Sequence, residues 1–374
     1  MELEASTKSG ALMPTLFEPF SLGKLDLANR LVMAPLTRNR AGAGMVPQDL
    51  AVEYYRQRAS AGLIITEGTQ PSAVGQGYLT TPGLHSAEQV EGWRKVADAV
   101  HGAGGAIVVQ LMHVGRVSHP DNKDGLETVA PSAIAAPGEM FTAGGPKAHP
   151  VPRALETDEL PLIVEEFVHA AKSAIEAGLD GVELHSANGY LLHQFLSPAS
   201  NRRTDNYGGS PENRARLVIE IAQAVTAAIG PERVGIRISP GHQVLGMDET
   251  DAADLAATYG TLIDGIAPLG LAYLHVLADP SVAGPGSALV QDLRRRFGGP
   301  LIGNDGFGTV TTREDAARIV EGGLADLVAV GRNFIANPDL VTRWQTGAAL
   351  NEPDSATFYG GGAEGYTDYP FLTD

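Results

Sequence analysis

The chain has 374 residues, with 43% hydrophobic and 19% charged side chains, a composition that is ordinary for a globular enzyme. Its 27 basic and 44 acidic residues give a net charge of −17, which argues against nucleic acid or an anionic membrane surface as a partner. No run of about 18 apolar residues predicts a membrane span, and the lack of cysteine excludes disulfides, thiolate catalysis, zinc–thiolate sites and iron–sulfur clusters. We expect a cytoplasmic protein.

Short apolar runs alternate with longer amphipathic stretches along most of the chain. Residues 1–14 precede this alternation and predict a flexible tail. Strands are expected at 31–34, 63–66, 107–111, 181–184, 234–238, 273–276, 301–303 and 326–330. Helices are expected at 48–61, 86–103, 159–177, 211–229, 249–267, 287–297, 311–321 and 338–346.

This repeated strand–helix order predicts an α/β fold, a single (β/α)8 TIM barrel within residues 1–374. A doubly wound parallel sheet is the alternative. Such a sheet usually places a G-x-G-x-x-G motif after its first strand, where this chain has MAPLTRNR instead.

Two segments lie outside the alternation. Residues 112–158, between the third strand and the third helix, are rich in Gly, Pro, His and Ala and are too long for a plain loop. They predict a lid over the barrel mouth, with 128–134 as one arm of a hairpin. Residues 347–374 follow the last helix and are expected to lie over the mouth as well.

Polar residues stand at the carboxyl end of every predicted strand, where barrel enzymes carry their active sites. Each would cost about 1–3 kcal/mol if it were buried without a partner, so the set implies a bound polar ligand. In chain order they are Thr37, Glu67, Gly68, Gln110, His185, Arg237, His275, Asn304, Asp305, Gly331 and Arg332.

The fourth strand leads into the most informative stretch, where His185, Asn188 and Tyr190 follow one another closely. Two hydrogen-bond donors and a phenol that converge here would hold an oxygen atom and deliver a proton. The alternative is a helix N-terminus decorated with polar caps.

The last two strands carry NDGFG (304–308) and AVGR (329–332). Glycine turns beside a helix N-terminus form a phosphate cradle in barrels, and Arg332 would add a charge-assisted contact. The alternative is that these glycines serve only the turns. With Gln110, Arg237 and Thr37 around the mouth, the set suits a phosphorylated planar cofactor whose ring carries heteroatoms at its edge.

Several motifs resemble the Old Yellow Enzyme family, in particular its bacterial N-ethylmaleimide and nitrate-ester reductase branch. They are MAPLTR (33–38), ITEGT (65–69), VQLMHVGR (109–116), the block from 183 to 217, GIRISP (235–240), VGRNFIANPDL (330–340) and FYGGGAEGYTDYP (358–370). The resemblance implies an FMN-dependent, NADPH- or NADH-consuming ene-reductase. Its substrates would be small activated alkenes such as enones, enals, maleimides and nitroalkenes, with nitrate esters as further candidates.

The resemblance also implies roles for individual residues. Flavin N5 would give hydride to the alkene, His185 and Asn188 would hold the substrate oxygen, and Tyr190 would supply the proton. The implied cofactor contacts are Pro35, Thr37, Gly68, Gln110, Arg237, Gly306, Gly331 and Arg332. The implied substrate pocket contains Tyr78, Met112, Gln243 and Tyr359. Met112 departs from the tryptophan of many family members, which predicts a roomier pocket.

Two other classes of function compete. One is a non-redox barrel enzyme acting on a phosphorylated substrate, but no predicted strand ends in the catalytic lysine that such chemistry often uses. The other is a flavin-binding protein without turnover, which would not need His185, Asn188 and Tyr190. We expect no metal site, because no carboxylate is seen to complete the pair His185 and His193. We expect a monomer or a homodimer.

Overall fold

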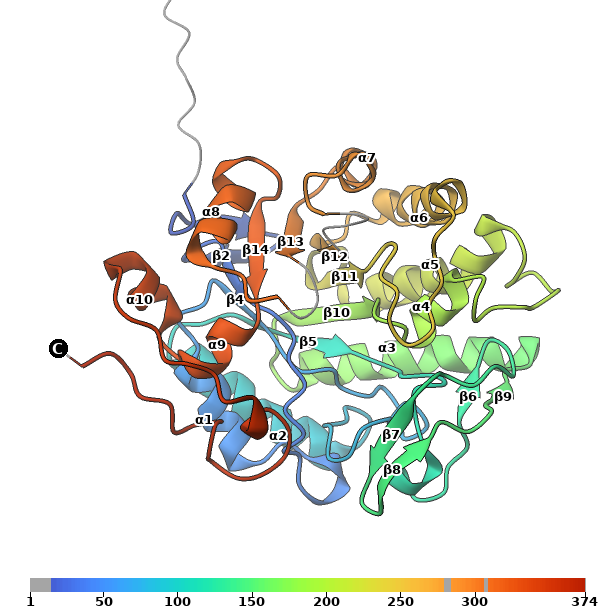
Figure 1. Cartoon of the computed structure of the whole chain (residues 1–374), viewed down its shortest axis with the longest axis horizontal. Helices are drawn as coiled ribbons and strands as arrows, with labels where there is room; N and C mark the ends of the chain where they lie inside the picture. Colours follow the sequence, from blue (N-terminus) through green and yellow to red (C-terminus); the bar gives the residue numbers. More distant parts are fainter. Residues whose placement is uncertain (1–14, 279–283, 306–308, 374) are drawn as a thin grey trace, which may run out of the picture.

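The computed structural model describes residues 15–278, 284–305 and 309–373, so the tail predicted at 1–14 lies outside the described residues. Parallel strands close into an eight-stranded barrel in chain order, which confirms the predicted TIM barrel (Figure 1). The barrel strands are β3 (Leu31–Met33), β4 (Leu63–Ile65), β5 (Ile107–Leu111), β10 (Gly181–Ser186), β11 (Val234–Ile238), β12 (Tyr273–Ala278), β13 (Leu301–Asp305) and β14 (Leu327–Val330).

Helices surround the barrel, and each of those predicted is present within a few residues of its expected bounds (Figure 1). They are α1 (Asp49–Gln57), α2 (Ala87–Gly102), α3 (Leu160–Glu176), α5 (Pro211–Ile229), α6 (Ala252–Ile266), α7 (Ala288–Phe297), α8 (Arg313–Glu321) and α10 (Leu340–Thr346). The short helices α4 (Leu191–Leu196) and α9 (Arg332–Ala336) were not predicted, because one turn and a half shows no periodicity. Among the described residues, no helix combines the length and apolar character that a bilayer span requires.

The pleat of the strands divides the barrel interior into an apolar floor and a polar mouth. Alternate residues of a strand face the same side. Val108, Tyr273 and Ile302 therefore belong to one apolar cluster. Two residues further along the same strands stand Gln110, His275 and Asn304, all buried. The prediction that the fourth strand ends before His185 was wrong, since β10 continues through Ser186 and His185 occupies an inward position of the pleat.

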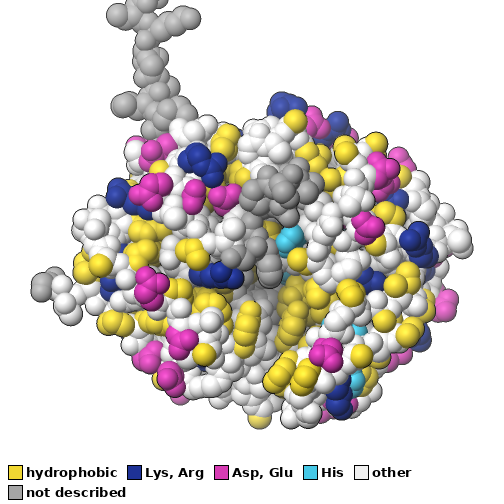
Figure 2. All heavy atoms as spheres, in the orientation of Figure 1, with side chains coloured by type: hydrophobic (Ala, Val, Ile, Leu, Met, Phe, Trp, Pro, Cys, Tyr) yellow, Lys and Arg dark blue, Asp and Glu magenta, His cyan; other side chains and the backbone are white. Residues whose placement is uncertain are grey.

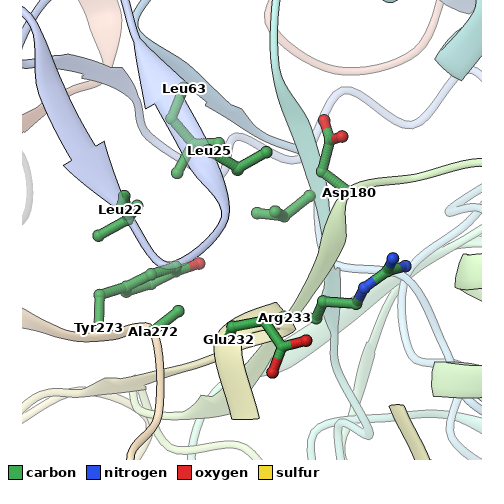
Figure 3. A pocket seen from close by; sticks show the side chains of 9 residues that line it. Leu22, Leu25, Leu63, Asp180, Glu232, Arg233, Ala272 and Tyr273 are labelled. Atoms are coloured by element: carbon green, nitrogen blue, oxygen red, sulfur yellow. The ribbon is translucent and has the colours of Figure 1, made fainter. Parts of the chain in front are cut away.

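A short hairpin closes the floor of the barrel. Its strands are β1 (Phe20–Leu22) and β2 (Leu25–Leu27), which place Leu22 and Leu27 in the interior cluster. A small cavity remains between this hairpin and the barrel, with Leu22, Leu25 and Tyr273 on its wall (Figure 3). A Cβ on Gly235 would lie 2.1 Å from the Tyr273 ring, so this floor requires glycine at 235.

The long excursion after β5 contains two small sheets. The predicted hairpin arm at 128–134 was wrong, because β6 (Val129–Ala130) pairs in parallel with β9 (Arg153–Ala154). The hairpin lies further along, formed by β7 (Glu139–Thr142) and β8 (Gly145–Ala148) around a glycine-rich turn. From it, Met140 packs in one cluster with Met112, against which Tyr78 and Tyr190 also pack.

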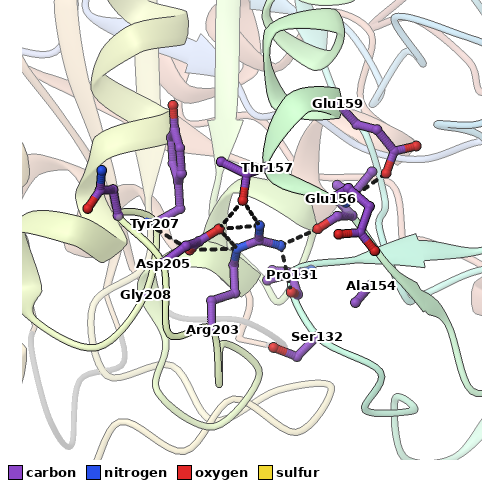
Figure 4. Close-up of polar contacts among 12 residues, drawn as sticks. Pro131, Ser132, Ala154, Glu156, Thr157, Glu159, Arg203, Asp205, Tyr207 and Gly208 are labelled. Carbon is purple, nitrogen blue, oxygen red and sulfur yellow. Dashed lines mark hydrogen bonds and ion pairs between the residues drawn. The ribbon is translucent and has the colours of Figure 1, made fainter.

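Arg203 connects residue 131 of this excursion with residue 155, near its end (Figure 4). Its guanidinium donates to the carbonyl oxygens of Pro131 and Leu155, and it is paired with Asp205 at 3.1 Å. Arg203 and Asp205 thus form an ion pair within their own loop.

The C-terminal segment is bound to the loop after β3 through its backbone. Arg38 donates to the carbonyls of Phe358 (2.9 Å) and Gly365 (2.7 Å), and Arg40 donates to the carbonyl of Gly362 (3.0 Å). The Tyr366 ring, fully buried, stacks on Tyr54 of α1 with centroids 4.1 Å apart. This segment therefore packs as part of the barrel surface.

Substitution of Arg58 tests how strongly α1 holds α9. The buried Arg58 guanidinium donates to the carbonyls of Phe334 (2.7 Å), Ile335 (2.6 Å) and Tyr54 (2.9 Å). Arg58→Met leaves these buried acceptors unsatisfied, and we expect a loss of about 3–5 kcal/mol in urea unfolding. The matched control is Arg56→Met, which removes an exposed pair with Glu53 and should cost about 0–1 kcal/mol. Equal losses would contradict the assignment.

Candidate active site

A buried carboxylate, that of Glu183 in β10, organises the polar mouth of the barrel. Its two oxygens lie 2.8 Å from Nε2 of Gln110 in β5 and 2.9 Å from Nδ1 of His275 in β12. Burial alone would raise the pKa of Glu183, but His275 and Arg237 outweigh it and hold the pKa below its ordinary value. Burial lowers the pKa of His275. Glu183 is therefore ionised, and one of its oxygens accepts a hydrogen bond from Nδ1 of His275.

Gln110 and Arg237 are oriented by this layer. Because the carboxylate of Glu183 only accepts hydrogen bonds, the Gln110 amide nitrogen faces it and the amide oxygen remains to accept from a ligand. Arg237 in β11 donates to Oδ1 of Asn304 at 2.8 Å, and its Nε is buried without a partner. The barrel mouth thus presents a cation beside an amide, the predicted surroundings of a heteroatom-edged ring.

His185 and Tyr190 lie against each other, with Asn188 in the turn between them. The rings of His185 and Tyr190 meet edge to face with centroids 5.0 Å apart. Nδ1 of His185 and Oδ1 of Asn188 are buried without partners. Burial, with Arg237 next in importance, lowers the pKa of His185 well below its ordinary value, so the imidazole is neutral at pH 7. Buried polar atoms in this state point to a ligand with hydrogen-bonding groups.

The Tyr190 hydroxyl lies 2.8 Å from the hydroxyl of Tyr78. Burial and the neighbouring Tyr78 raise the pKa of Tyr190 well above its ordinary value, so this phenol keeps its proton at neutral pH. Met112 is buried beside both rings, and a Cβ on Gly68 would come within 2.5 Å of its side chain. Tyr78, Met112 and Gly68 are therefore brought together with Tyr190.

The remaining predicted pocket residues are placed differently. Tyr359 stands on the C-terminal segment with 69% of its surface exposed, and Gln243 is exposed on the loop after β11. Tyr359 nevertheless lies near the site, since it contributes to the raised pKa values of Tyr78 and Tyr190. Figure 2 shows the face of the molecule seen in Figure 1, with acidic side chains spread around its edge and hydrophobic side chains nearer its centre.

Residue 311, which precedes α8, contacts the residues that follow β14. Asn333 of α9 donates to the carbonyl of Thr311 at 2.8 Å, and Gly331 immediately precedes Arg332 at the start of that helix. Arg332 is half-buried. Gly306 lies outside the described residues.

Thr37 and Pro35, both half-buried, lie in the loop that follows β3. Glu67 fixes the backbone of that loop, since its Oε2 accepts hydrogen bonds from the backbone N–H groups of Arg38 (3.0 Å) and Asn39 (3.2 Å). Glu67 was expected to point to the ligand but serves the backbone instead. Burial raises its pKa to about 7.

Two groups of residues in this region were not predicted. Glu183 could have been found, because it stands two residues before His185 and must share its face of the strand. The other is the buried contact of His193 with Glu249, 3.0 Å apart, although no carboxylate had been expected to complete a pair of His185 and His193. Within the described parts of the chain, no three His, Asp or Glu side chains are arranged to hold a metal ion.

The barrel and its mouth define a class, the TIM-barrel enzymes that bind a polar ligand at the carboxyl ends of their strands. Residues 15–351 match the model of the NADH:flavin oxidoreductase / NADH oxidase family. The chain belongs to this family, that of the Old Yellow Enzymes, and is an NAD(P)H-dependent flavin oxidoreductase.

Relatives match along nearly the whole chain. A probable flavin mononucleotide-dependent alkene reductase of Leishmania infantum is 42% identical over 99% of this chain and 100% of its own. The 12-oxophytodienoate reductase 1 of Oryza sativa subsp. japonica is 40% identical over 99% and 96%. Among solved structures, morphinone reductase in complex with tetrahydroNAD is 47% identical with a TM-score of 0.90, covering 96% of this chain and 98% of that one. An Old Yellow Enzyme homologue from Zymomonas mobilis is 39% identical with the same TM-score over 96% and 100%.

The raised pKa of Glu67 predicts a pH dependence of stability. The folded pKa of about 7 lies above the ordinary value of 4.5, so the native state holds this proton longer than the unfolded chain. The contribution of Glu67 to stability is full below pH 4.5 and falls as the pH rises toward 7, by up to about 3 kcal/mol. Glu67→Gln keeps an oxygen to accept from Arg38 and Asn39 but cannot ionise. We expect the stability of the variant relative to the parent to rise between pH 5 and pH 8 in urea unfolding. A difference independent of pH would refute this.

Proposed function

We propose that this enzyme reduces the C=C bond of small activated alkenes at the barrel mouth. The observation that carries the proposal is the buried, unpartnered ring nitrogen Nδ1 of His185 beside the protonated phenol of Tyr190. The set combines an oxygen-binding pair with a proton donor, which is the equipment that addition of hydride and proton across an activated double bond requires. The alkene reductase of Leishmania infantum supports it by its similarity.

FMN fits the residues that are present. Gln110 offers an amide oxygen and Arg237 an unpartnered Nε at one side of the mouth, where a flavin ring would present N–H and C=O groups. Thr37 and Gly68, with Pro35, would lie along the ring, and Gly331 and Arg332, with Gly306, would hold the phosphate. When bound, FMN supplies the hydride, which the nicotinamide reductant has delivered to it.

His185 and Asn188 stabilise the charge that develops on the substrate. The carbonyl or nitro oxygen of an activated alkene gains negative charge as hydride reaches the β-carbon. A neutral His185 offers one ring N–H, and Asn188 offers its amide N–H groups, so both can donate to this oxygen. Donors fixed beforehand in a buried site stabilise this charge without reorganisation.

Tyr190 delivers the proton to the α-carbon. Its raised pKa keeps the hydroxyl protonated until a strongly basic, carbanion-like centre arises. The Tyr78 hydroxyl, 2.8 Å away and half-buried, is placed to return a proton to Tyr190 from the solvent side.

The borders of the site set its substrate class. Met112 and Met140 provide flexible apolar walls, which favour enones, enals, maleimides and nitroalkenes of varied shape. The excursion 112–158 and the segment 347–374, carrying Tyr359, would cover the bound substrate, with Gln243 at the edge. Morphinone reductase in complex with tetrahydroNAD supports a nicotinamide reductant, and parallel assays with NADPH and NADH would establish the preference.

Substitution of Tyr190 tests the proton donor. Tyr190→Phe should slow reoxidation of the reduced enzyme by 2-cyclohexenone by about 10²–10⁴-fold, because the acid is lost. Reduction of the enzyme by NADPH should remain near normal in the same stopped-flow experiment. Tyr207→Phe, whose hydroxyl contacts Glu220, serves as the control. Unchanged turnover of the enone by Tyr190→Phe would remove Tyr190 from the mechanism.

Substitution of His185 tests the oxygen-binding pair. Phenols mimic the enolate, so His185→Ala should bind them about 10–100-fold more weakly, through loss of a hydrogen bond to a charged oxygen. The long-wavelength charge-transfer band of the phenol complex should disappear with it. His101→Ala, at an exposed histidine paired with Asp180, is the control. Persistence of the band in His185→Ala would show that the oxygen lies elsewhere.

A further inference from the structure

The turn that carries Asn188 and Tyr190 has an unusual backbone. Asn188 has φ of +57° and Gly189 has φ of +83°, both in the left-handed region. Asn tolerates this region better than most residues but still at a cost. Such a conformation persists where surrounding contacts specify it.

Each backbone N–H of the turn has a definite acceptor. That of Asn188 donates to Oγ of Ser239 at 2.9 Å, and that of Gly189 donates to Nδ1 of His193 at 3.0 Å. The carbonyl of Gly189 accepts from Nε2 of Gln194 at 2.8 Å. His193 and Gln194 belong to the following helix, α4, so that helix holds the turn from behind.

His193 is itself held on its other ring nitrogen. Its Nε2 lies 3.0 Å from Oε1 of Glu249, whose Oε2 accepts from the N–H of Gly241 (3.0 Å) and the hydroxyl of Tyr259 (3.2 Å). His193 and Tyr259 are fully buried and Glu249 nearly so. Glu249 lies on the segment that follows β11, so the contact joins the loops at the ends of two adjacent barrel strands.

These contacts determine where the His193 proton lies. The Gly189 N–H is a donor, so Nδ1 must carry a lone pair, and the ring proton must then sit on Nε2. A carboxylate at Nε2 favours that tautomer, because it only accepts. Glu249 therefore stabilises the form of His193 that can receive the Gly189 N–H.

We propose that His193 and Glu249 are positioning residues for the reaction, which fix the Asn188–Tyr190 turn through the Gly189 N–H and so set the donor geometry at the substrate oxygen and α-carbon. This inference rests on the proposed function. A displacement of catalytic groups by about 1 Å can cost 10²-fold in rate, so the bond to Gly189 bears on the reaction itself.

Two substitutions of His193 test the roles of its two ring nitrogens one at a time. The amide oxygen of Asn reaches the place of Nδ1, so His193→Asn keeps an acceptor for Gly189 and loses the contact with Glu249. The amide of Gln reaches the place of Nε2, so His193→Gln keeps a donor to Glu249 and loses the acceptor. Each variant gives up one of two buried hydrogen bonds, which makes their stabilities comparable.

The holoenzyme variants would be compared by flavin content, thermal midpoint, phenol affinity and stopped-flow reoxidation with 2-cyclohexenone. We expect His193→Gln to slow reoxidation about 10–100-fold and to weaken phenol binding. His193→Asn should retain most of both properties. Equal behaviour of the two variants, with rates that follow stability, would overturn the proposal and leave His193 a structural residue.

The wild-type holoenzyme provides a test that does not depend on variants folding. A neutron structure should place a deuteron on His193 Nε2 and none on Nδ1, and a deuteron on Nδ1 would overturn the proposal. The proposed function itself would fail if the enone did not reoxidise the wild-type enzyme, or if Tyr190→Phe were reoxidised as fast as wild type. If both of these tests support the proposed function but His193→Asn and His193→Gln behave alike, only the inference about His193 fails.

Discussion

The site depends on one buried negative charge placed inside a closed barrel. Glu183 is fully buried, and its carboxylate accepts hydrogen bonds from Gln110 on the adjacent strand β5 and from His275 on β12, two strands away on the other side. A buried ionised group is costly unless partners surround it, so this carboxylate dictates what its neighbours can be. It also compensates Arg237, whose side chain would otherwise bring an unbalanced cation into the barrel. The polar mouth is thus a consequence of charge balance above an apolar floor.

Around this layer, the residues proposed to bind the ligand differ from the residues that position the loops carrying them. Glu67 accepts a hydrogen bond from the backbone N–H of the residue after Thr37, and Ser239 accepts one from the backbone N–H of Asn188. Both act on main-chain N–H groups, so they position the loops and leave the side chains there free for ligand. In such loops the backbone is held in place while the side chains can be substituted.

The sequence predicted the barrel and its strands, because strand–helix alternation is a local pattern, and polar residues at the strand ends drew attention to His185, Asn188 and Tyr190. It did not predict the contact of His193 with Glu249, since partners 56 residues apart in the chain leave no local signal. The sequence predicted a hairpin arm at 128–134 and missed the hairpin of β7 and β8, because the only local signal of a short exposed hairpin is its turn, here the glycines at 144 and 145. The exposure of Tyr359 and Gln243 depends on how distant segments pack, which spacing along the chain does not encode.

The way in which Arg38 and Arg40 hold the C-terminal segment has an evolutionary consequence. Both guanidinium groups grip carbonyl oxygens at 357–365, and every residue type supplies such an oxygen. The side chains of that strip can therefore vary without loosening its attachment, except at Gly360, Gly361 and Gly365, whose φ values are positive. Diversification of what the enzyme accepts can proceed there by point mutation while the catalytic centre stays unaltered.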